Sequence, residues 1–250
     1  MKAKEFIYRV VKYLSHMLGY DLVIAKKLHG KSDHELIIPY ATYAPWKTDK
    51  QFRDVYSTIQ NYTMVDIYRC YELWNLVAQA SKLPGAILEV GVWRGGTGAL
   101  IAKRAKMFDK NRAIYLCDTF TGLIKSGKHD PVFKDGDFDN ASKESVKKLL
   151  TTLQLLHVHI LEGRFPEDTA TLIRSDKISF CHIDVDVYQS AKDIYDWVWP
   201  KLAMGGIIVF DDYGFHPCKG ITKFVDELRK EKNCAIMHNL NGQAVVIKMR

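Results

Sequence analysis

Cysteines are scarce in this 250-residue chain, and their spacing excludes a disulfide framework or a structural zinc site. There are 5 of them, an odd number, widely spaced and without a C-x-x-C pair. Small secreted domains and zinc knuckles need cysteines in close pairs. Cys117 and Cys181 instead lie inside apolar runs, as buried thiols do. We therefore expect a cytoplasmic protein whose core, in a chain of this length, needs no covalent staples.

Long apolar runs are missing as well. No stretch reaches the roughly 18 apolar residues of a membrane-spanning helix. The N-terminal segment MKAKEFIYRVVKYLSHMLGYDLVI carries a charge every few positions, so it lacks the apolar centre of a signal peptide. Internal repeats and low-complexity stretches are also absent. With 47% hydrophobic and 26% charged residues, the composition is that of an ordinary globular protein.

Charges of one sign do not gather into a block. The chain has 36 Lys and Arg against 29 Asp and Glu, a formal net charge of +7, and much of the excess lies in the first thirty residues. Because none of it resembles a nucleic-acid-binding arm, we expect no nucleic-acid partner. A modest basic excess fits an anionic substrate or a membrane surface equally well.

The first 18 residues predict an amphipathic helix, because apolar residues recur there at helical spacing between basic ones. One interpretation is that the stripe packs on its own domain or on a second subunit, and most such stripes do pack in this way. The other is an interfacial helix that contacts a membrane through residues 1–25. The apolar residues of the stripe are Phe6, Ile7, Val10, Val11, Leu14 and Leu18.

From Ala86 onward, short apolar strands alternate with amphipathic helices, which predicts a mostly parallel sheet covered on both faces. Parallel strands are expected at 86–91, 113–118, 157–161, 178–184 and 206–211. The helices between and after them are expected at 97–109, 141–153, 167–174, 190–199 and 218–232.

The C-terminus breaks this alternation. Apolar segments 234–239 and 244–249 flank Asn241-Gly242, the favoured two-residue hairpin turn, so the last strand should be antiparallel. A seven-stranded α/β sheet closed by such a hairpin is the plan of the Rossmann-like class I methyltransferases. We assign residues 1–80, including a helix at 62–80, to an N-terminal helical extension and lid, and residues 81–250 to the methyltransferase domain.

The segment LEVGVWRGGTG (88–98) is a glycine-rich turn between the first strand and a helix, where α/β sheets bind nucleotide-type ligands. Trp93 replaces the second glycine of the dinucleotide fingerprint, which disfavours a pyrophosphate. A methyl donor fits better. After Gly91, the backbone N–H groups near Gly95 and Gly96 suit its carboxylate, and Glu89 suits its amine. A tight turn without a ligand is the alternative.

The next two strands also end in candidate donor-binding residues. Asp118 lies roughly 25 residues past the glycine-rich turn, where an acid accepts both ribose hydroxyls. Taken alone, it is equally a helix cap or a turn aspartate. The third strand ends in LEGRFPED (161–168), so Gly163, Arg164 and Phe165 are expected to line the adenine side.

The segments HIDVDVY (182–188) and VFDDYG (209–214) bring aspartates to the carboxyl ends of neighbouring strands, which lie about 4.8 Å apart. Asp184, Asp211 and Asp212 should therefore converge, with Asp186 close by. Carboxylates so close repel one another unless a cation compensates, and Mg²⁺ prefers oxygen ligands. Coordination would lower the pKa of an acceptor hydroxyl, and Asp184 could also take its proton. The alternative is a set of surface caps.

Three other patterns are given structural roles. The segment DGDFDN (135–140) begins like a calcium loop but lacks the later glycine and glutamate, so it predicts a solvated lid. His216 and Cys218 are half of a zinc site without a second pair. Ser190 and Asp193 have the spacing of a capping box.

Several motifs in order resemble the macrocin O-methyltransferase (TylF-type) family, over roughly residues 60–232. The resemblance implies S-adenosylmethionine- and Mg²⁺-dependent methyl transfer to a hydroxyl, often on a sugar, and self-association into a homodimer or higher oligomer. It also implies metal ligation by Asp184, Asp211 and Asp212, a lid at Thr63 and Met64, and donor contacts at the strand ends, including Thr119. The motifs are YTMVDIYRCYEL (62–73), GVWRGG (91–96), DTFTGL (118–123), EGRFPEDT (162–169), HIDVDVYQS (182–190), Gly205-Gly206 and FDDYG (210–214).

The leading hypothesis is therefore a metal-dependent O-methyltransferase acting on a sugar hydroxyl of a natural product or surface glycan. Phenolic or catechol acceptors remain open, because the metal chemistry is the same. Two further hypotheses are a nucleotide-dependent oxidoreductase and a non-catalytic donor-binding module. The segments 1–50 and 124–140 fall outside the resemblance, so the acceptor is not identified.

Overall fold

The structure, a computed structural model, describes residues 2–19, 34, 35, 37 and 41–250. It contains two compact units, Met1–Ala41 and Thr42–Arg250. In the first, helix α1 spans Lys2–Met17, which agrees with the predicted helix, and Val10, Val11 and Leu14 are exposed. Phe6 and Ile7 lie outside the side chains that the structure describes. Among the described residues, no helix is both long enough and apolar enough to cross a membrane.

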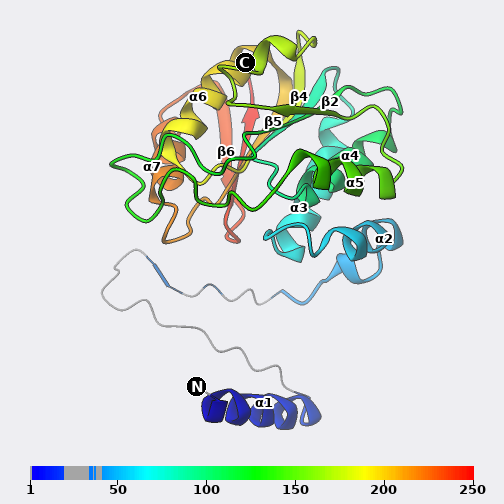
Figure 1. Cartoon of the computed structure of the whole chain (residues 1–250), viewed down its shortest axis with the longest axis vertical. Coiled ribbons are helices and arrows are strands. Elements are labelled where there is room, and N and C mark those ends of the chain that lie inside the picture. The colour runs from blue at the N-terminus through cyan, green and yellow to red at the C-terminus, as the bar shows by residue number, and fades with distance from the viewer. Residues whose placement is uncertain (1, 20–33, 36, 38–40) are drawn as a thin grey trace. The chain divides into compact units, whose positions relative to one another are not determined.

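The second unit is built on a seven-stranded sheet in the order β3-β2-β1-β4-β5-β7-β6 (Figure 1). β1 to β5 pair in parallel, whereas β7 is antiparallel to both β5 and β6. The predicted seven-stranded sheet with its C-terminal hairpin is therefore confirmed. The strands are β1 Ala86–Val90, β2 Ile114–Asp118, β3 His159–Glu162, β4 Ile178–Ile183, β5 Leu202–Asp211, β6 Cys234–His238 and β7 Gln243–Lys248.

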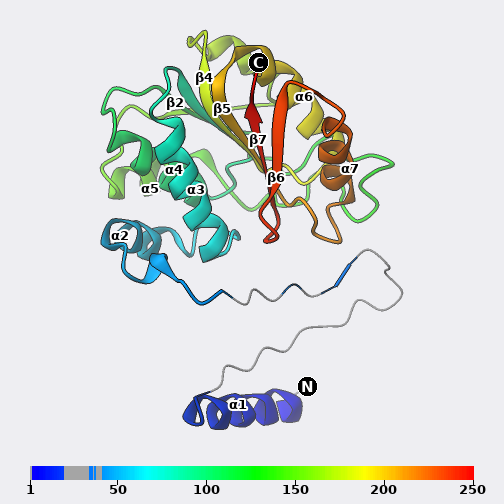
Figure 2. The ribbon, with the colours of Figure 1, turned by 180° about the vertical axis from the view of Figure 1, so that it is seen from behind.

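Helices cover both faces of this sheet, as Figures 1 and 2 show from opposite sides. Buried side chains form one apolar core between the sheet and α2–α5, and a second core between the sheet and α6 and α7. The helices are α2 Lys50–Ile59, α3 Ile67–Ala80, α4 Gly96–Lys106, α5 Lys143–Thr152, α6 Tyr188–Val198 and α7 Lys219–Leu228, with 3₁₀ turns η1 Pro45–Lys47, η2 Ala170–Leu172 and η3 Trp199–Lys201.

The domain boundary lies earlier than predicted. α2, which the sequence pattern did not predict, and α3 bury Phe52, Leu73 and Trp74 in the same core as Ile87 of β1. Residues 42–80 therefore fold with the seven-stranded sheet, and the compact unit begins at Thr42 instead of residue 81.

Two predicted helix starts are also wrong. α3 begins only at Ile67, after Asp66, whose carboxylate accepts from the N–H groups of its first turn. α6 begins at Tyr188, so Ser190 lies inside the helix and donates to the carbonyl of Ile124 instead of capping. The predicted helix at 167–174 is only a 3₁₀ turn, Ala170–Leu172.

Candidate active site

Two adjoining cavities lie at the carboxyl ends of the parallel strands. The larger, of about 750 Å³, is lined from the ends of β1, β2, β3 and β4, and the smaller, of about 440 Å³, from the ends of β4 and β5 together with α3. Their shared lining residues are Met64, Trp93, Asp184 and Asp186.

The glycine-rich turn is tightly held. Gly91 has φ +88°, and a Cβ there would lie 1.7 Å from the carbonyl oxygen of Asp184, so only glycine lets the ends of β1 and β4 meet. A Cβ at Gly96 would lie 2.7 Å from Cβ of Thr63, which holds the segment before α3 against the turn.

Two of the backbone N–H groups at the glycine-rich turn have partners within the chain. The N–H of Gly95 donates to the carbonyl of Val92 at 2.8 Å, and the N–H of Gly96 donates to that of Tyr62 at 3.0 Å. Both groups already have partners, so neither is free for a ligand carboxylate. Both glycines help to shape the turn, because Gly95 is the N-cap of α4 in the left-handed conformation.

Asp118 lines the larger cavity and also organises the turn. Its Oδ2 accepts from the N–H of Val92 at 2.6 Å and of Trp93 at 2.8 Å, and its Oδ1 accepts from Phe120 at 2.7 Å. Thr119 follows it into the same cavity. The turn-aspartate role is therefore present, and the remaining lone pairs of the carboxylate leave room for the predicted ribose contact.

Of the three residues predicted for the adenine side, two line the larger cavity. Gly163 and Phe165 do so, with Phe165 packed edge-on against Trp197. Arg164 does not. Its guanidinium pairs with Asp168 at 3.0 Å, and its side chain is 59% exposed. The ion pair with Asp168, four residues later in the chain, keeps the Arg164 guanidinium in solvent.

Glu89 was predicted to meet the donor amine, but it does not face either cavity. Its side chain is fully buried and lies outside the lining of both cavities. Its Oε1 lies 2.9 Å from Nδ1 of His182, at hydrogen-bond distance. Burial raises the pKa of Glu89. Since side chains alternate along a strand, Glu89 faces α4 while its neighbour Val90 lines the larger cavity.

The aspartates of the fourth and fifth strand ends do converge on the smaller cavity. Asp184, Asp186, Asp211 and Asp212 all line it. Burial and then the neighbouring carboxylates of Asp211 and Asp212 raise the pKa of Asp184 well above its usual range. Burial also raises the pKa of Asp186 to about 6. Such mutual repulsion indicates a site that a cation would stabilise.

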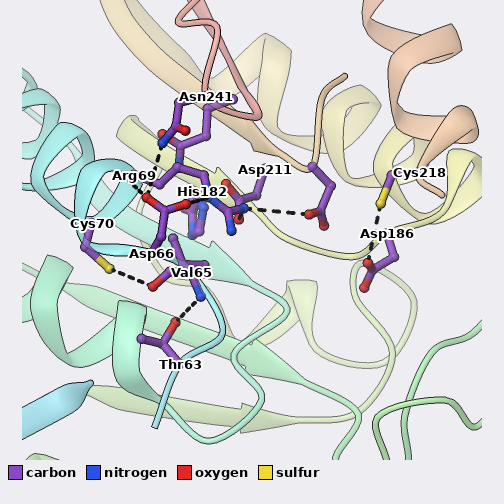
Figure 3. A network of polar contacts seen from close by, with 12 residues as sticks. Thr63, Val65, Asp66, Arg69, Cys70, His182, Asp186, Asp211, Cys218 and Asn241 are labelled. Atoms are coloured by element: carbon purple, nitrogen blue, oxygen red, sulfur yellow. Dashed lines mark hydrogen bonds and ion pairs between the residues drawn. The ribbon is translucent and has the colours of Figure 1, made fainter. Parts of the chain in front are cut away.

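Arg69 is the functional neighbour that the sequence analysis missed. From α3, its Nη1 donates to Asp211 Oδ2 at 2.8 Å and lies 3.7 Å from Asp212 Oδ1, while Nε donates to Asp66 at 2.8 Å. Figure 3 shows Arg69 between Asp66 and Asp211, with Asn241 of the C-terminal hairpin bonded to Asp66. A buried arginine on an otherwise apolar helix face was the available signal.

The donor set fits a divalent cation, although the arrangement differs from a single triad. Ligand atoms of His182, Asp184 and Asp211 lie within 4.8 Å of one another, and those of Asp186, Asp212 and Cys218 form a second such group. Oδ1 of Asp211 is buried and has no hydrogen-bond partner. The guanidinium of Arg69 thus faces more carboxylates than it can neutralise. Because a buried carboxylate oxygen normally has a partner, Oδ1 of Asp211 is a candidate ligand for a cation.

The predicted lid lines the larger cavity through Ile124 and Phe138. It is anchored by Asp130, a buried residue whose carboxylate accepts from the N–H of Gly127 and from that of Tyr188 in the first turn of α6. At its far end, Asn140 accepts from the indole N–H of Trp93 at 2.7 Å. Asp130 thus anchors the middle of the lid, whereas five of the six residues of 135–140, the segment predicted to be solvated, are exposed.

The sheet, with its antiparallel β7, and the cavities at the strand ends define a class I, S-adenosylmethionine-dependent methyltransferase. The family model of macrocin-O-methyltransferase (TylF) matches residues 32–248. The chain belongs to this family, which confirms the resemblance seen in its motifs.

Three similar proteins narrow the reaction to O-methylation. Demethyldecarbamoylnovobiocin O-methyltransferase of Streptomyces niveus is 28% identical over 187 residues, which are 70% of this chain and 70% of the relative. The 8-demethyl-8-(2,3-dimethoxy-alpha-L-rhamnosyl)-tetracenomycin-C 4'-O-methyltransferase of Streptomyces olivaceus is 26% identical over 170 residues, 63% of this chain and 65% of the relative. The structure of the O-methyltransferase NovP has a TM-score of 0.66 at 25% identity, covering 76% of this chain and 83% of that one.

Proposed function

We propose that the protein transfers a methyl group from S-adenosylmethionine to a sugar hydroxyl of a natural product or glycan, with a divalent cation held by the acidic cluster. The observation that carries the proposal is the shared boundary of the two cavities. Met64, Trp93, Asp184 and Asp186 lie between the larger cavity and the cavity that holds the carboxylates. A reacting methyl group and a hydroxyl can meet there.

The donor is assigned to the larger cavity. Asp118 and Thr119 line it and would bind the ribose, and Gly163 and Phe165 line it and would contact the adenine. Met64 lines both cavities and Thr63 lines the smaller one, so the segment before α3 would close over the methionine part of the donor where the cavities adjoin. Trp93 has φ +47° and its ring is bonded to Asn140, so the approach that a pyrophosphate needs is blocked, which argues against an oxidoreductase.

The acidic cluster is assigned to the acceptor. Asp184, Asp211 and Asp212 would hold Mg²⁺, which would lower the pKa of the acceptor hydroxyl and orient it. Arg69 keeps Asp211 in place at 2.8 Å. The donor would supply the methyl group, whose bond to sulfur would break as the hydroxyl oxygen bonds to the methyl carbon, and a carboxylate of this chain would take the hydroxyl proton.

Two carboxylates are candidates for that proton. Asp184 lines both cavities, but a ligand of the cation has less electron density to offer a proton. Asp186 also lines both cavities and is not among the three carboxylates assigned to the cation. We therefore assign the base to Asp186 and the ligand role to Asp184. Asp184→Asn should weaken metal binding, whereas Asp186→Asn should leave it intact.

A sugar acceptor is preferred over a phenol because one relative is named for a rhamnosyl substrate. A phenolic acceptor would use the same base and metal. A panel of glycosylated and phenolic natural products, each incubated with labelled donor, tests the choice.

The first test is calorimetric titration of S-adenosylhomocysteine into the full chain, with Mg²⁺ and then with EDTA. Micromolar binding in both buffers is expected, because the donor and the cation occupy different cavities. No binding by folded protein in either buffer would refute the donor assignment. Loss of methyl transfer in EDTA, with donor binding retained, would support the metal. Full activity in excess chelator would contradict it.

We also propose that the basic, amphipathic α1 has a partner outside its own helix. Val10, Val11, Leu14 and Met17 are exposed on it, and Arg9 and Lys12 are interspersed. A second copy of the chain and an anionic membrane surface are both compatible with this pattern. Light scattering and vesicle co-sedimentation of the full chain, compared with a variant lacking residues 1–25, distinguish them.

A further inference from the structure

A buried polar pair lies behind the acidic cluster. Glu89 of β1 and His182 of β4 are register partners on neighbouring strands, and neither side chain is exposed. The rest of this face is apolar, with Ile87, Phe180 and Val209 in the same core. Apolar side chains would fill the space without the cost of desolvating a carboxylate and an imidazole, so packing alone does not explain the pair.

One nitrogen of this pair has no partner. Nδ1 of His182 is engaged by Glu89 at 2.9 Å, whereas Nε2 is buried and makes no hydrogen bond. Oδ1 of Asp211, two residues beyond the register partner of His182, is in the same state. A buried polar atom without a partner costs about 1–3 kcal/mol. Two of them on neighbouring strands suggest a shared partner that binds both.

His182 lies outside the lining of both cavities, but one of its ring nitrogens is close enough to the carboxylates of Asp184 and Asp211 to share a cation with them. One ligand atom each from His182, Asp184 and Asp211 lie within 4.8 Å of one another. Nitrogen and oxygen ligands bind metals such as zinc at about 2.0–2.2 Å. Two donors on opposite sides of one ion are therefore about 4.0–4.4 Å apart, within the 4.8 Å that limits this group. A nitrogen ligand was not among the residues predicted from the sequence.

We propose that His182, through Nε2, is a ligand of the cation held by Asp184 and Asp211, and that Glu89 positions the imidazole. The proposal rests on the metal-dependent function above. A hydrogen bond from Nδ1–H to Glu89 fixes the tautomer in which Nε2 carries a lone pair, the usual arrangement behind a metal-binding histidine. Glu89 is thus a positioning residue instead of a donor-binding one.

The consequence concerns which metal is bound. Mg²⁺ prefers oxygen ligands, whereas an imidazole nitrogen suits later divalent metals, whose affinity rises from Mn²⁺ to Co²⁺. We expect Mn²⁺ to bind at least tenfold more tightly than Mg²⁺. Competition calorimetry on the full chain without donor or acceptor measures this difference.

The decisive measurement is pulsed electron paramagnetic resonance of the Mn²⁺-loaded wild-type chain. A directly bound imidazole produces modulation from its ¹⁴N nucleus, which carboxylates and water do not. His182→Gln should lose the modulation and bind Mn²⁺ roughly 10–100-fold more weakly, and Glu89→Gln should keep the modulation with a smaller loss of affinity. His159→Gln, on the distant strand β3, is the matched control and should match the wild type.

The outcomes separate this proposal from the function on which it rests. Bound Mn²⁺ without ¹⁴N modulation in the wild type would overturn the histidine ligand and leave the metal-dependent reaction standing. Modulation that survives in His182→Gln would do the same. No Mn²⁺ binding by the wild type would overturn both. Because the wild-type spectrum decides the main question, a variant that fails to fold does not leave it open.

Discussion

Replacing Arg69 by Gln tests how the charge of the acidic cluster is balanced. The Arg69 side chain is 9% exposed and that of Asp211 is 1% exposed, with 2.8 Å between Nη1 and Oδ2. Removing one partner of a buried pair typically costs about 3–5 kcal/mol, because the other charge stays buried. At about 2–4 °C per kcal/mol for a chain of this size, Tm in EDTA should fall by roughly 6–20 °C.

A cation should reverse much of this loss. Without the guanidinium, the carboxylates have more need of a positive ligand, so added Mg²⁺ or Mn²⁺ should raise Tm more in Arg69→Gln than in the wild type. A ligand at 100 times its Kd stabilises the folded state by about 2.7 kcal/mol. The assay is thermal unfolding by calorimetry, in EDTA and then in a metal series.

Arg112→Gln is the matched control. Arg112 is similarly buried and donates to the carbonyls of Ser81, Leu83 and Gly85, away from the cluster. It should lose stability without gaining sensitivity to metal. Equal Tm values for Arg69→Gln and the wild type in EDTA would refute the reasoning. So would the same metal-induced rise in both arginine variants.

Three further predictions concern the rest of the site. Asp186→Asn should bind S-adenosylhomocysteine and metal normally but lose about 10²-fold or more in methyl transfer, and normal turnover would exclude it as the base. Gly91→Ala should lower the free energy of unfolding, measured with denaturant, by more than about 2 kcal/mol, because backbone strain at φ +88° adds to a steric clash. The control Gly136→Ala, at φ +92° but with open space around it, should lower it by only about 1–2 kcal/mol. Asp130→Ala should lower the free energy of unfolding by about 1 kcal/mol and speed proteolysis within 119–142. Unchanged cleavage would show that contacts other than those of Asp130 hold the lid.

Much of the fold was predictable because it depends on periodicity. Apolar strands alternating with helices gave the five parallel strands, and Asn241-Gly242 gave the hairpin. The carboxyl ends of parallel strands meet at one edge, so the convergence of Asp184 and Asp211 followed from the same pattern. α2 was missed because its short apolar face, with Phe52 and Val55, has meaning only once the core it covers is known.

The buried polar residues around the site were predicted less well than the fold. Side chains alternate between the two faces of a strand, so Glu89 and its neighbour Val90 lie on opposite faces. The strand assignment alone could therefore have predicted that Glu89 faces away from the cavity that Val90 lines. Its partner, His182, was not, because the register of β1 against β4 is a tertiary property. Arg69 lies 142 residues from Asp211 in the sequence, and no local pattern records such a pair.

Backbone conformation explains how one edge of the sheet holds two groups of donors. Asp184 directly follows β4, and Asp211 is the last residue of β5, and both belong to the group with His182. Asp186 and Asp212 have positive φ values, +59° and +64°, and belong to the group with Cys218. The left-handed conformation turns the chain sharply just past each strand, so neighbouring aspartates serve different groups. Strain of about 1–3 kcal/mol at each position, added to carboxylate repulsion, is expected where geometry serves chemistry more than stability. A cation held by Asp184, Asp211 and Asp212 would then leave Asp186 free to accept a proton.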